Sequence, residues 1–306
     1  MYALNRNELR TFKAICEGAT STASLADTLD ISTISVYRTV NSLSSSKLVE
    51  VKRTGKRIQL SLSPHGHSKA LSAYLEGGRR PIDPLIGSRL LVLLSVSSNP
   101  KVLERVAEEV RLSNESVRRI VWALRGFGAI SQEKMTISIP PSDTTLARFL
   151  QDFSKGACAA MLESIAPSGT VLWSEGLEFL FSSRTPANAR CVAETGITAM
   201  SKRGLRFMSD ARYYHYAYWR PRLRREDIAL HHVLVDPSST RNISYALLFL
   251  MKEGFSPAYL ARLGDALGAR ALAGQIASFL SGGTVDSPHF PSRADMAELC
   301  TEYGVR

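Results

Sequence analysis

The sequence predicts an α+β protein of 306 residues in which a helical unit ending in a β-hairpin occurs twice and a mixed α/β region follows. Three observations support this. Apolar residues recur at helical spacing through the first 49 residues, an alternating hairpin pattern follows, and the whole pattern returns 81 positions later. We therefore expect two similar domains over 1–78 and 82–141, a connecting helix over 142–166, and a mixed α/β domain over 167–306.

The helical unit begins with two supporting helices. Leu9, Phe12 and Ile15 recur at the spacing of one helix face, so residues 4–18 predict a first helix with that face in the core. A shorter helix follows, because Ser21 is a capping residue ahead of an amphipathic segment. The apolar residues of this short amphipathic helix are Leu25, Ala26 and Leu29.

The stretch Ile31–Val49 is the centre of the unit. Val36, Val40 and Leu43 recur at helical spacing, and Asp30–Ser32 makes a tight connection from the preceding helix, which gives a helix-turn-helix pattern. The opposite face is polar, slender and carries one cation. Such a face suits a helix that enters a major groove, where side chains present hydrogen-bond donors without excess bulk. Its residues are Thr33, Ser35, Tyr37, Arg38 and Asn41.

A β-hairpin with a cationic tip comes next. The segment VEVKRTGKRIQLSLS alternates apolar and polar residues on both sides of Thr54-Gly55, so it predicts two short strands. A further helix from Ser63 to Tyr74 follows. We interpret His65 and His67 as part of its solvated start rather than as metal ligands, since no third ligand is near. The cations of the tip are Lys52, Arg53, Lys56 and Arg57.

Two helices, a groove-facing helix and a basic hairpin, in this order over roughly residues 4–76, resemble the winged-helix DNA-binding domain of MarR-type regulators. The resemblance adds to the reading of the outward helix face. We expect Thr33, Ser35, Tyr37, Arg38 and Asn41 to contact bases or phosphates, and the four hairpin cations to contact the flanking phosphate backbone.

The first domain reappears after the predicted linker Gly77–Pro81. With a shift of 81 positions the matched pairs are Ala26/Ala107, Leu29/Val110, Ile31/Leu112, Ser32/Ser113, Ser35/Ser116, Val36/Val117, Arg38/Arg119, Val40/Val121, Leu43/Leu124 and Val49/Ile130. Such a repeat predicts a second winged helix. Its helices are expected over Ile86–Val96, Lys101–Val110 and Asn114–Arg125.

The second copy differs from the first where DNA contacts are expected. Its hairpin is short, with only Glu133 and Lys134 at the tip, and Trp122 takes the place of Asn41. An exposed tryptophan would fit an interface, and a buried position in a small side core is the alternative. The copy is either a second DNA-reading head or a structural copy that packs, dimerises or orients the first. Its candidate DNA contacts are Asn114, Ser116, Arg118 and Arg119.

A long helix leads out of the repeat. Ser142-Asp143 caps a segment from Thr144 to about Ile165 whose apolar residues follow a helical period. They are Leu146, Phe149, Leu150, Phe153, Cys158, Met161 and Leu162. We interpret the helix as a connector, with a dimer seam as the alternative.

The last domain mixes strands and helices. Gly169–Phe181 and Arg190–Ala199 predict strands or short strand-helix units, and residues 201–225 place YYHYAYW among eight cations. Aromatics among arginines suit single-stranded nucleic acid. A strand whose alternate aromatics are buried and whose arginines pair with Glu226, Asp227 and other carboxylates is the favoured alternative.

Helices end the chain. They are expected over Asn242–Glu253, from Ser256 to Leu263, and over Gly268–Leu280, with a tail partly ordered by Met296 and Leu299. The segment EDIALHHVLVDP and the array ending in LARLGDALGARALAGQIASFL resemble the carboxyl-terminal region of AbiEi-type antitoxin regulators.

Enzyme signatures are missing from the sequence. A metal-dependent nuclease or nucleotidyltransferase would need several acids around divalent cations, and the candidates are Glu175, Glu178, Glu194, Asp210, Asp227 and Asp236. They lack the local patterns of those enzymes, and there is no phosphate loop, GxSxG elbow or HExxH motif. We therefore expect no enzyme, no cofactor and no metal.

Composition favours an anionic partner. The net charge is +10 and the pI is about 9.6, which favours binding to a phosphate backbone. Cys16, Cys158, Cys191 and Cys300 are isolated, so buried free thiols in a reduced, cytoplasmic setting are expected. No apolar run is long enough to span a membrane.

The sequence as a whole predicts a cytoplasmic regulator that reads double-stranded DNA. Its last domain would serve for homo-oligomerisation, a protein partner or a small-molecule effector. The alternatives are an adaptor of the transcription or replication machinery and a protein with a nuclease-like last domain.

Overall fold

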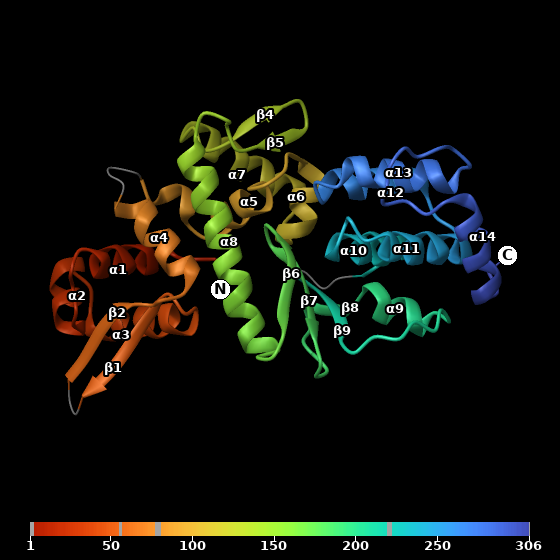
Figure 1. The fold of residues 1–306 in the computed structure, drawn as a ribbon. Helices are drawn as coiled ribbons and strands as arrows, with labels where there is room; N and C mark the ends of the chain where they lie inside the picture. Colours follow the sequence, from red (N-terminus) through yellow and green to blue (C-terminus); the bar gives the residue numbers. More distant parts are fainter. Residues whose placement is uncertain (1–2, 55–56, 77–80, 219–221, 306) are drawn as a thin grey trace. The chain divides into compact units, whose positions relative to one another are not determined.

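The computed structural model describes residues 3–54, 57–76, 81–218 and 222–305, and for Thr54 and Arg57 it describes only the backbone. Helices alternate with small sheets, so the α+β class is confirmed (Figure 1). The chain divides into two compact units. The first comprises Met1–Met161 with Glu175–Leu177, and the second comprises Leu162–Ser174 with Glu178–Arg306.

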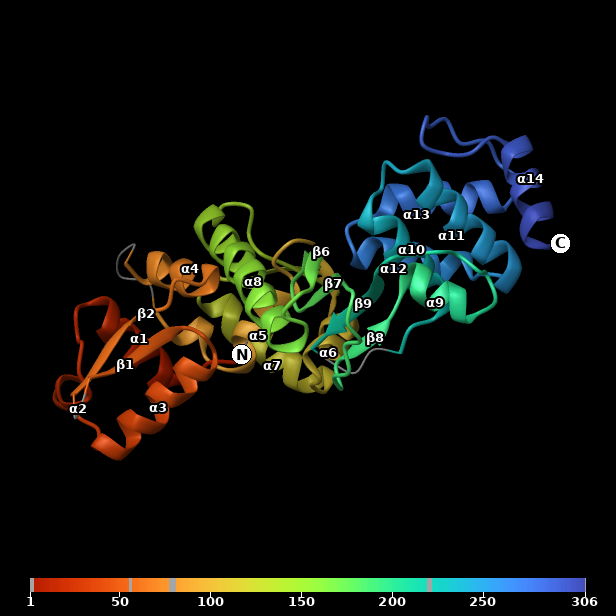
Figure 2. The ribbon, with the colours of Figure 1, turned by 60° about the horizontal axis from the view of Figure 1, so that its bottom comes forward.

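The first module of unit 1 contains the predicted elements in the predicted order. They are α1 (Arg6–Cys16), α2 (Thr22–Leu29), α3 (Thr33–Ser45), β1 (Val49–Thr54), β2 (Arg57–Leu62) and α4 (Gly66–Glu76). The strands pair antiparallel from Val49 opposite Leu62 to Thr54 opposite Arg57, so the predicted hairpin is confirmed. Helices α1 and α3 and the two strands of the hairpin lie together in this module (Figure 2).

Helix ends in this module follow local chemistry. Helix α1 starts later than predicted, because Asn5 and Glu8 form a capping box that fixes its first residue. Helix α2 is capped by Ser21, as predicted, and ends at Asp30, which has a left-handed backbone with φ 52°. This residue makes the sharp connection into α3.

The second module has the same order of helices and hairpin as the first, but a short strand precedes its second helix and its hairpin strands are shorter. Its elements are the 3₁₀ turn η1 (Asp83–Leu85), α5 (Ser88–Ser95), β3 (Lys101–Val102), α6 (Leu103–Val110), α7 (Asn114–Gly126), β4 (Ser131–Glu133) and β5 (Thr136–Ser138). The prediction of a helix from Lys101 was wrong for its first two residues. Lys101 pairs with Ile137 of β5 and forms a strand, so the helix begins at Leu103.

The repeat is visible in backbone geometry. The residue before the turn into α3, Asp30, is left-handed, and so is its counterpart Arg111 ahead of α7. Ser32 and Ser113 cap α3 and α7 in the same way. The two helices also bury matching residues. These are Val36, Val40 and Leu43 in α3 and Val117, Val121 and Leu124 in α7.

Helix α8 (Thr144–Ile165) packs against α4 of the first module. The ring of Phe149 stacks on that of Tyr74 with centroids 4.3 Å apart, and Phe153 meets the edge of His67 at 5.8 Å. Gly66 and Gly156 allow the two backbones to approach closely. The helix is therefore fixed to the first module along this face, and the boundary between the units falls near its end, after Met161.

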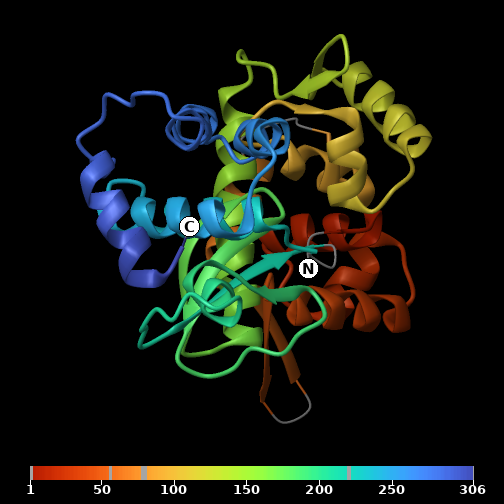
Figure 3. The ribbon, with the colours of Figure 1, turned by 90° about the vertical axis from the view of Figure 1, so that its right-hand side faces the viewer.

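Unit 2 combines a sheet with a helical array. Its strands are β6 (Thr170–Glu175), β7 (Glu178–Ser183), β8 (Val192–Glu194) and β9 (Arg212–Ala217), in the order β6-β7-β9-β8, although Glu175 at the end of β6 belongs to unit 1. Its helices are α9 (Gly196–Lys202), α10 (Arg225–Val235), α11 (Thr240–Glu253), α12 (Pro257–Ala266), α13 (Arg270–Leu280) and α14 (Arg293–Tyr303). Helices α12 and α13 run side by side (Figure 3).

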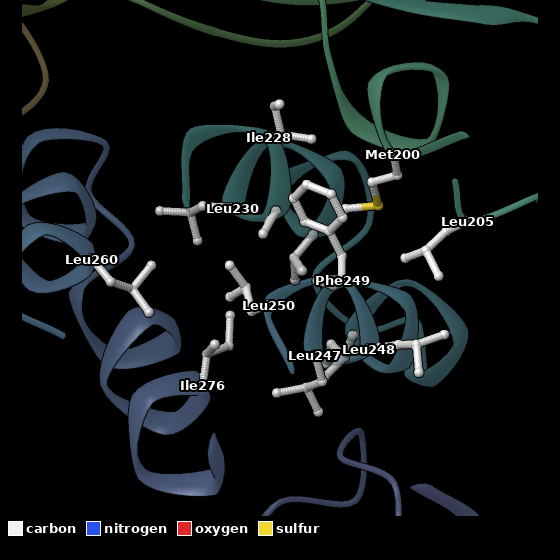
Figure 4. Packing of buried hydrophobic residues seen from close by; sticks show 14 of the residues in the cluster. Met200, Leu205, Ile228, Leu230, Leu247, Leu248, Phe249, Leu250, Leu260 and Ile276 are labelled. Atoms are coloured by element: carbon white, nitrogen blue, oxygen red, sulfur yellow. The ribbon is translucent and has the colours of Figure 1, made fainter. Parts of the chain in front are cut away.

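The core of unit 2 lies around α11. Leu247, Leu248, Phe249 and Leu250 are each fully buried, so this helix is covered on nearly all sides. Side chains from α9, α10, α12 and α13 meet it there (Figure 4). The predicted contribution of Met296 to ordering the tail is confirmed, because this side chain is 3 % exposed.

Two predictions about composition meet the structure here. No helix among the described residues is long and apolar enough to cross a membrane. No disulfide joins the described cysteines, but only Cys158 is buried. The expectation of buried thiols was wrong for the other three, which are half-buried. They are Cys16, Cys191 and Cys300.

Candidate nucleic-acid interface

Helix α3 separates an apolar face from a polar one. Val36 and Leu43 are fully buried and Val40 is 2 % exposed, so one side of the helix is fixed in the core of the first module. The opposite side carries the predicted contact residues. Of these, Thr33, Tyr37, Arg38 and Asn41 are exposed to solvent. The described part of the chain therefore leaves this face open to a ligand.

Ser35 differs from the other predicted contact residues. It is half-buried at the start of α3, where its backbone N–H donates to Ser32 Oγ at 3.3 Å and the two hydroxyls lie 2.9 Å apart. In the second module Ser116 and Ser113 repeat the arrangement, again with hydroxyls 2.9 Å apart. Both serines thus serve their helix caps, which leaves less of each hydroxyl for a base or a phosphate.

One residue of the α3 surface was missed by the sequence analysis. Ile34 is 64 % exposed, although it lies in the most apolar part of the stretch. The helical period holds the signal, because a residue two positions before the buried Val36 points about 200° away from it. Tyr37, one turn further on, is 43 % exposed. Together they give the polar face a small apolar facet.

The hairpin supplies cations beside α3. Lys52 and Arg53 lie on β1 and are exposed, which agrees with a role in contacting a phosphate backbone. The other two predicted contacts, Lys56 and the Arg57 side chain, lie outside the residues that the structure describes. Helix α3 and β1 are in contact within the first module.

The second module presents a different surface. Asn114, Arg118 and Arg119 are exposed on α7, and Glu115 forms ion pairs with both arginines at 3.9 and 3.1 Å. Trp122 is 78 % exposed, so the alternative of a side-core tryptophan was wrong. This face offers more charge than α3 and a larger aromatic group.

The aromatic segment in unit 2 does not form a base-stacking platform. Tyr214 and Tyr216 of β9 are 2 % and 5 % exposed, and they stack on Phe181 and Phe179 of β7. Several cations of residues 202–225 bind carboxylates instead. The pairs are Lys202 with Glu194, Arg203 with Glu253 and Arg225 with Glu226. The buried-strand interpretation is confirmed for the alternate aromatics, and the predicted arginine pairing is confirmed for Arg203 and Arg225, while Arg220 lies outside the described residues.

Unit 2 buries a group of polar side chains between its sheet and α10. His215 Nε2 lies 2.7 Å from Glu178 Oε2, and the His215 ring lies 4.4 Å from that of His231. His231 Nδ1 in turn lies 3.0 Å from Thr195 Oγ1. Each of these side chains is at most 3 % exposed, so the group is closed to a substrate in this conformation.

Neighbouring His232 is buried, and neither of its ring nitrogens has a hydrogen-bond partner among the described residues. Burial, aided by the positive charge of Arg241, lowers its pKa to about 4. The side chain is therefore neutral at pH 7. A Cβ added at Gly196 would lie 3.6 Å from His232 Nδ1, so the glycine and the imidazole are close neighbours.

The carboxylates considered for a metal site are held apart by different partners. Glu178 binds His215, Glu194 binds Lys202, and Asp227 accepts from the Tyr259 hydroxyl at 3.1 Å. Among the described residues, no three histidine, cysteine, aspartate or glutamate side chains form a group that would hold a metal ion.

His67 also departs from the prediction of a solvated helix start. It is fully buried, with Nε2 2.8 Å from the Ser46 carbonyl oxygen, and burial lowers its pKa. It joins the end of α3 to the start of α4. This histidine is thus a structural residue that helps to fix the position of α3.

Comparisons with protein-family models, with curated proteins and with solved structures found no match to this chain. The functional interpretation therefore depends on the geometry of the chain itself. In that geometry, the open face of α3 beside the cationic β1 strand is the surface best suited to a large anionic ligand.

Proposed function

We propose that this protein is a cytoplasmic, sequence-selective regulator of transcription that binds duplex DNA through α3. In this proposal the two modules are tandem winged helices, and α3 is the helix that enters the major groove. A recognition helix of this kind contacts base edges through residues near its N-terminus. Thr33, Tyr37, Arg38 and Asn41 fill that role here, and Lys52 and Arg53 hold the adjoining backbone.

The observation that carries the proposal is the open polar face of α3. Its inner residues are buried, whereas Tyr37 is 43 % exposed and Thr33, Arg38 and Asn41 are exposed as well. Such a face is solvated in the free protein and leaves these side chains available to a ligand. A DNA-binding helix needs it, because base readout requires slender donors and acceptors that reach the groove floor.

The second module adds phosphate contacts in this proposal. Arg118 and Arg119 would bind the backbone, and Asn114 and Ser116 lie at the end of α7 that a groove would meet first. The ion pairs with Glu115 do not prevent this. Exposed pairs of this kind contribute about 0–1 kcal/mol and exchange readily for a phosphate.

Salt dependence tests the phosphate contacts. Replacing Lys52 and Arg53 by alanine should lower the affinity for all duplexes and reduce the slope of log K against log salt by about 2, since each phosphate contact contributes roughly 0.9. Fluorescence anisotropy with labelled duplexes measures both. The double variant Arg148→Ala with Arg270→Ala removes the same net charge from side chains that are each 87 % exposed, and it should leave the slope nearly unchanged.

Sequence preference tests the base contacts. Thr33→Ala or Asn41→Ala should weaken binding to a selected site more than binding to random duplex, because the lost contacts are to bases. A loss of equal size on every sequence, for these variants and for the Lys52/Arg53 variant alike, would refute direct readout by α3.

One observation favours a second function, an adaptor that docks on a protein of the transcription or replication machinery. Trp122 is 78 % exposed on α7, and tryptophan is enriched where protein interfaces bind most tightly. In that case DNA binding would be weak and insensitive to salt, and Trp122→Ala would abolish capture of the partner while leaving duplex affinity unchanged.

A further inference from the structure

The apolar facet of α3 is made by Ile34 and Tyr37, which are 64 % and 43 % exposed and lie one helical turn apart. Leaving an isoleucine this exposed gives no stability to the free protein. The repeat does not require it either. The counterparts of Ile34 and Tyr37 in α7 are Glu115 and Arg118, which form an ion pair.

Asn41 continues the same stripe of the helix surface. It follows Ile34 by seven residues, which places the two side chains about 10 Å apart along the axis and nearly in line. This length corresponds to about three base pairs of B-DNA at 3.4 Å each. One helix lying along the groove can therefore present the apolar facet and the amide to neighbouring base pairs.

The apolar facet and the asparagine amide both favour an A·T base pair. In the major groove the methyl group of thymine is the one large apolar feature, and an asparagine amide matches the N6 and N7 atoms of adenine. Arginine suits guanine, but α3 carries a single cation among the exposed residues of this face, Arg38. The α7 face, with Arg118, Arg119 and Arg125, has the opposite balance.

We propose that α3 selects A·T base pairs, with Ile34, flanked by the Tyr37 ring, packed against a thymine methyl group and Asn41 bound to adenine. This inference rests on the proposed function and gives it a sequence class. Arg38 on the same helix and the exposed Lys52 and Arg53 on strand β1, which contacts α3, favour an anionic ligand over a second copy of this basic chain.

Modified bases test each contact. The full-length chain is used to select duplexes from a random pool, and the selected site is then prepared with deoxyuridine in place of each thymidine in turn. Loss of the methyl group at one or two positions should lower the affinity about fourfold, because the complex then lacks the burial of one methyl-sized apolar group. For Ile34→Ala the same replacement should have no effect. The variant should fold normally because the side chain is mostly exposed.

Adenine is tested in the same way with 7-deazaadenine, which lacks the N7 acceptor. We expect about a tenfold loss at one position for the native chain and none for Asn41→Ala. As a matched control, Glu115→Ala changes the residue equivalent to Ile34 in the second module, and this variant should retain the full response to both modified bases.

The outcomes separate this inference from the proposed function. Tight, salt-dependent duplex binding with no response to deoxyuridine, or a response that Ile34→Ala retains, would overturn A·T selection by α3 and leave duplex binding standing. A selected site without A·T pairs would do the same. Absence of salt-dependent duplex binding would overturn both, and concentration-dependent dimerisation lost in Ile34→Ala would assign the facet to a second copy instead.

Discussion

The contact between α8 and α4 gives the sharpest prediction about stability. Alanine normally stabilises a helix interior relative to glycine by about 0.5–1 kcal/mol. At Gly156, however, an added Cβ would lie 2.6 Å from the Gly66 carbonyl carbon and 2.9 Å from the His67 Cα, and closer still to the His67 nitrogen. These neighbours are backbone atoms, so they cannot rotate away. The two helices must separate by about 1 Å to restore ordinary contact.

Separation disturbs the ring contacts of Phe149 and Phe153 with α4, and overpacking of this kind costs about 1–3 kcal/mol. We therefore expect Gly156→Ala to destabilise unit 1 by about that amount. Gly274→Ala is the matched control, because Gly274 also lies inside a helix but has open space at its Cβ position. It should stabilise the protein by about 0.5–1 kcal/mol.

Urea unfolding measures both free energies, and hydrogen exchange followed by mass spectrometry locates the effect. In Gly156→Ala the amides of α4 and α8 should lose protection, whereas those of α13 should not change. A Gly156→Ala protein as stable as the Gly274→Ala protein would show that α8 does not press on α4, and the position assigned to α8 would be wrong.

Two further predictions concern buried ionisable side chains. Burial lowers the pKa of His232 from 6.5 to about 4, so the unfolded chain takes up a proton at this residue before the folded chain does. The free energy of unfolding should therefore fall as the pH drops from 6.5 toward 4, by roughly 3 kcal/mol in total. His232→Phe should flatten this part of the pH profile measured by urea unfolding, and an unchanged profile would contradict the prediction. Lys101 Nζ lies 3.0 Å from Glu109 Oε2, and both side chains are 1 % exposed. Glu109 keeps a second partner in Arg105, whose Nε lies 2.7 Å from its Oε1, so Lys101→Met should cost about 1–3 kcal/mol through loss of the fully buried partner. Adding Glu109→Gln should recover part of the loss, and a single variant as stable as the native chain would refute this role.

Local pattern was enough to predict the first module. The period of Val36, Val40 and Leu43 places the inner face of α3, and the alternation around the hairpin gives its strands. Both features depend on neighbours within a few residues. The buried face of a helix and the two strands of a hairpin can therefore be predicted from the local sequence alone.

The errors at Lys101 and His67 have a different cause, contacts between distant parts of the chain. KVLERVAEEV has a helical pattern throughout, yet Lys101 joins a strand because Ile137 pairs with it and the buried Glu109 and Glu175 receive its charge. His67 is buried because α8 supplies Phe153. No local pattern carries this information, since Ile137 follows Lys101 by 36 positions and Phe153 follows His67 by 86.

The aromatic segment of β9 shows the same limit. Alternation predicts one buried face, but β9 is an inner strand between β7 and β8, and Tyr214, His215 and Tyr216 are all buried. Inner strands covered on both sides lose the alternation. Two of the arginines around them, Arg203 and Arg225, form ion pairs with Glu253 and Glu226.

Photocrosslinking from α3 tests the central claim most directly. A benzophenone amino acid at position 37, in place of the exposed Tyr37, should crosslink to a selected duplex, and digestion should place the adduct on a base within the site. The same group at Met208, which is 97 % exposed in unit 2, should give little product. If the duplex binds tightly but crosslinks from position 208 and not from position 37, then α3 is not the helix that lies against DNA.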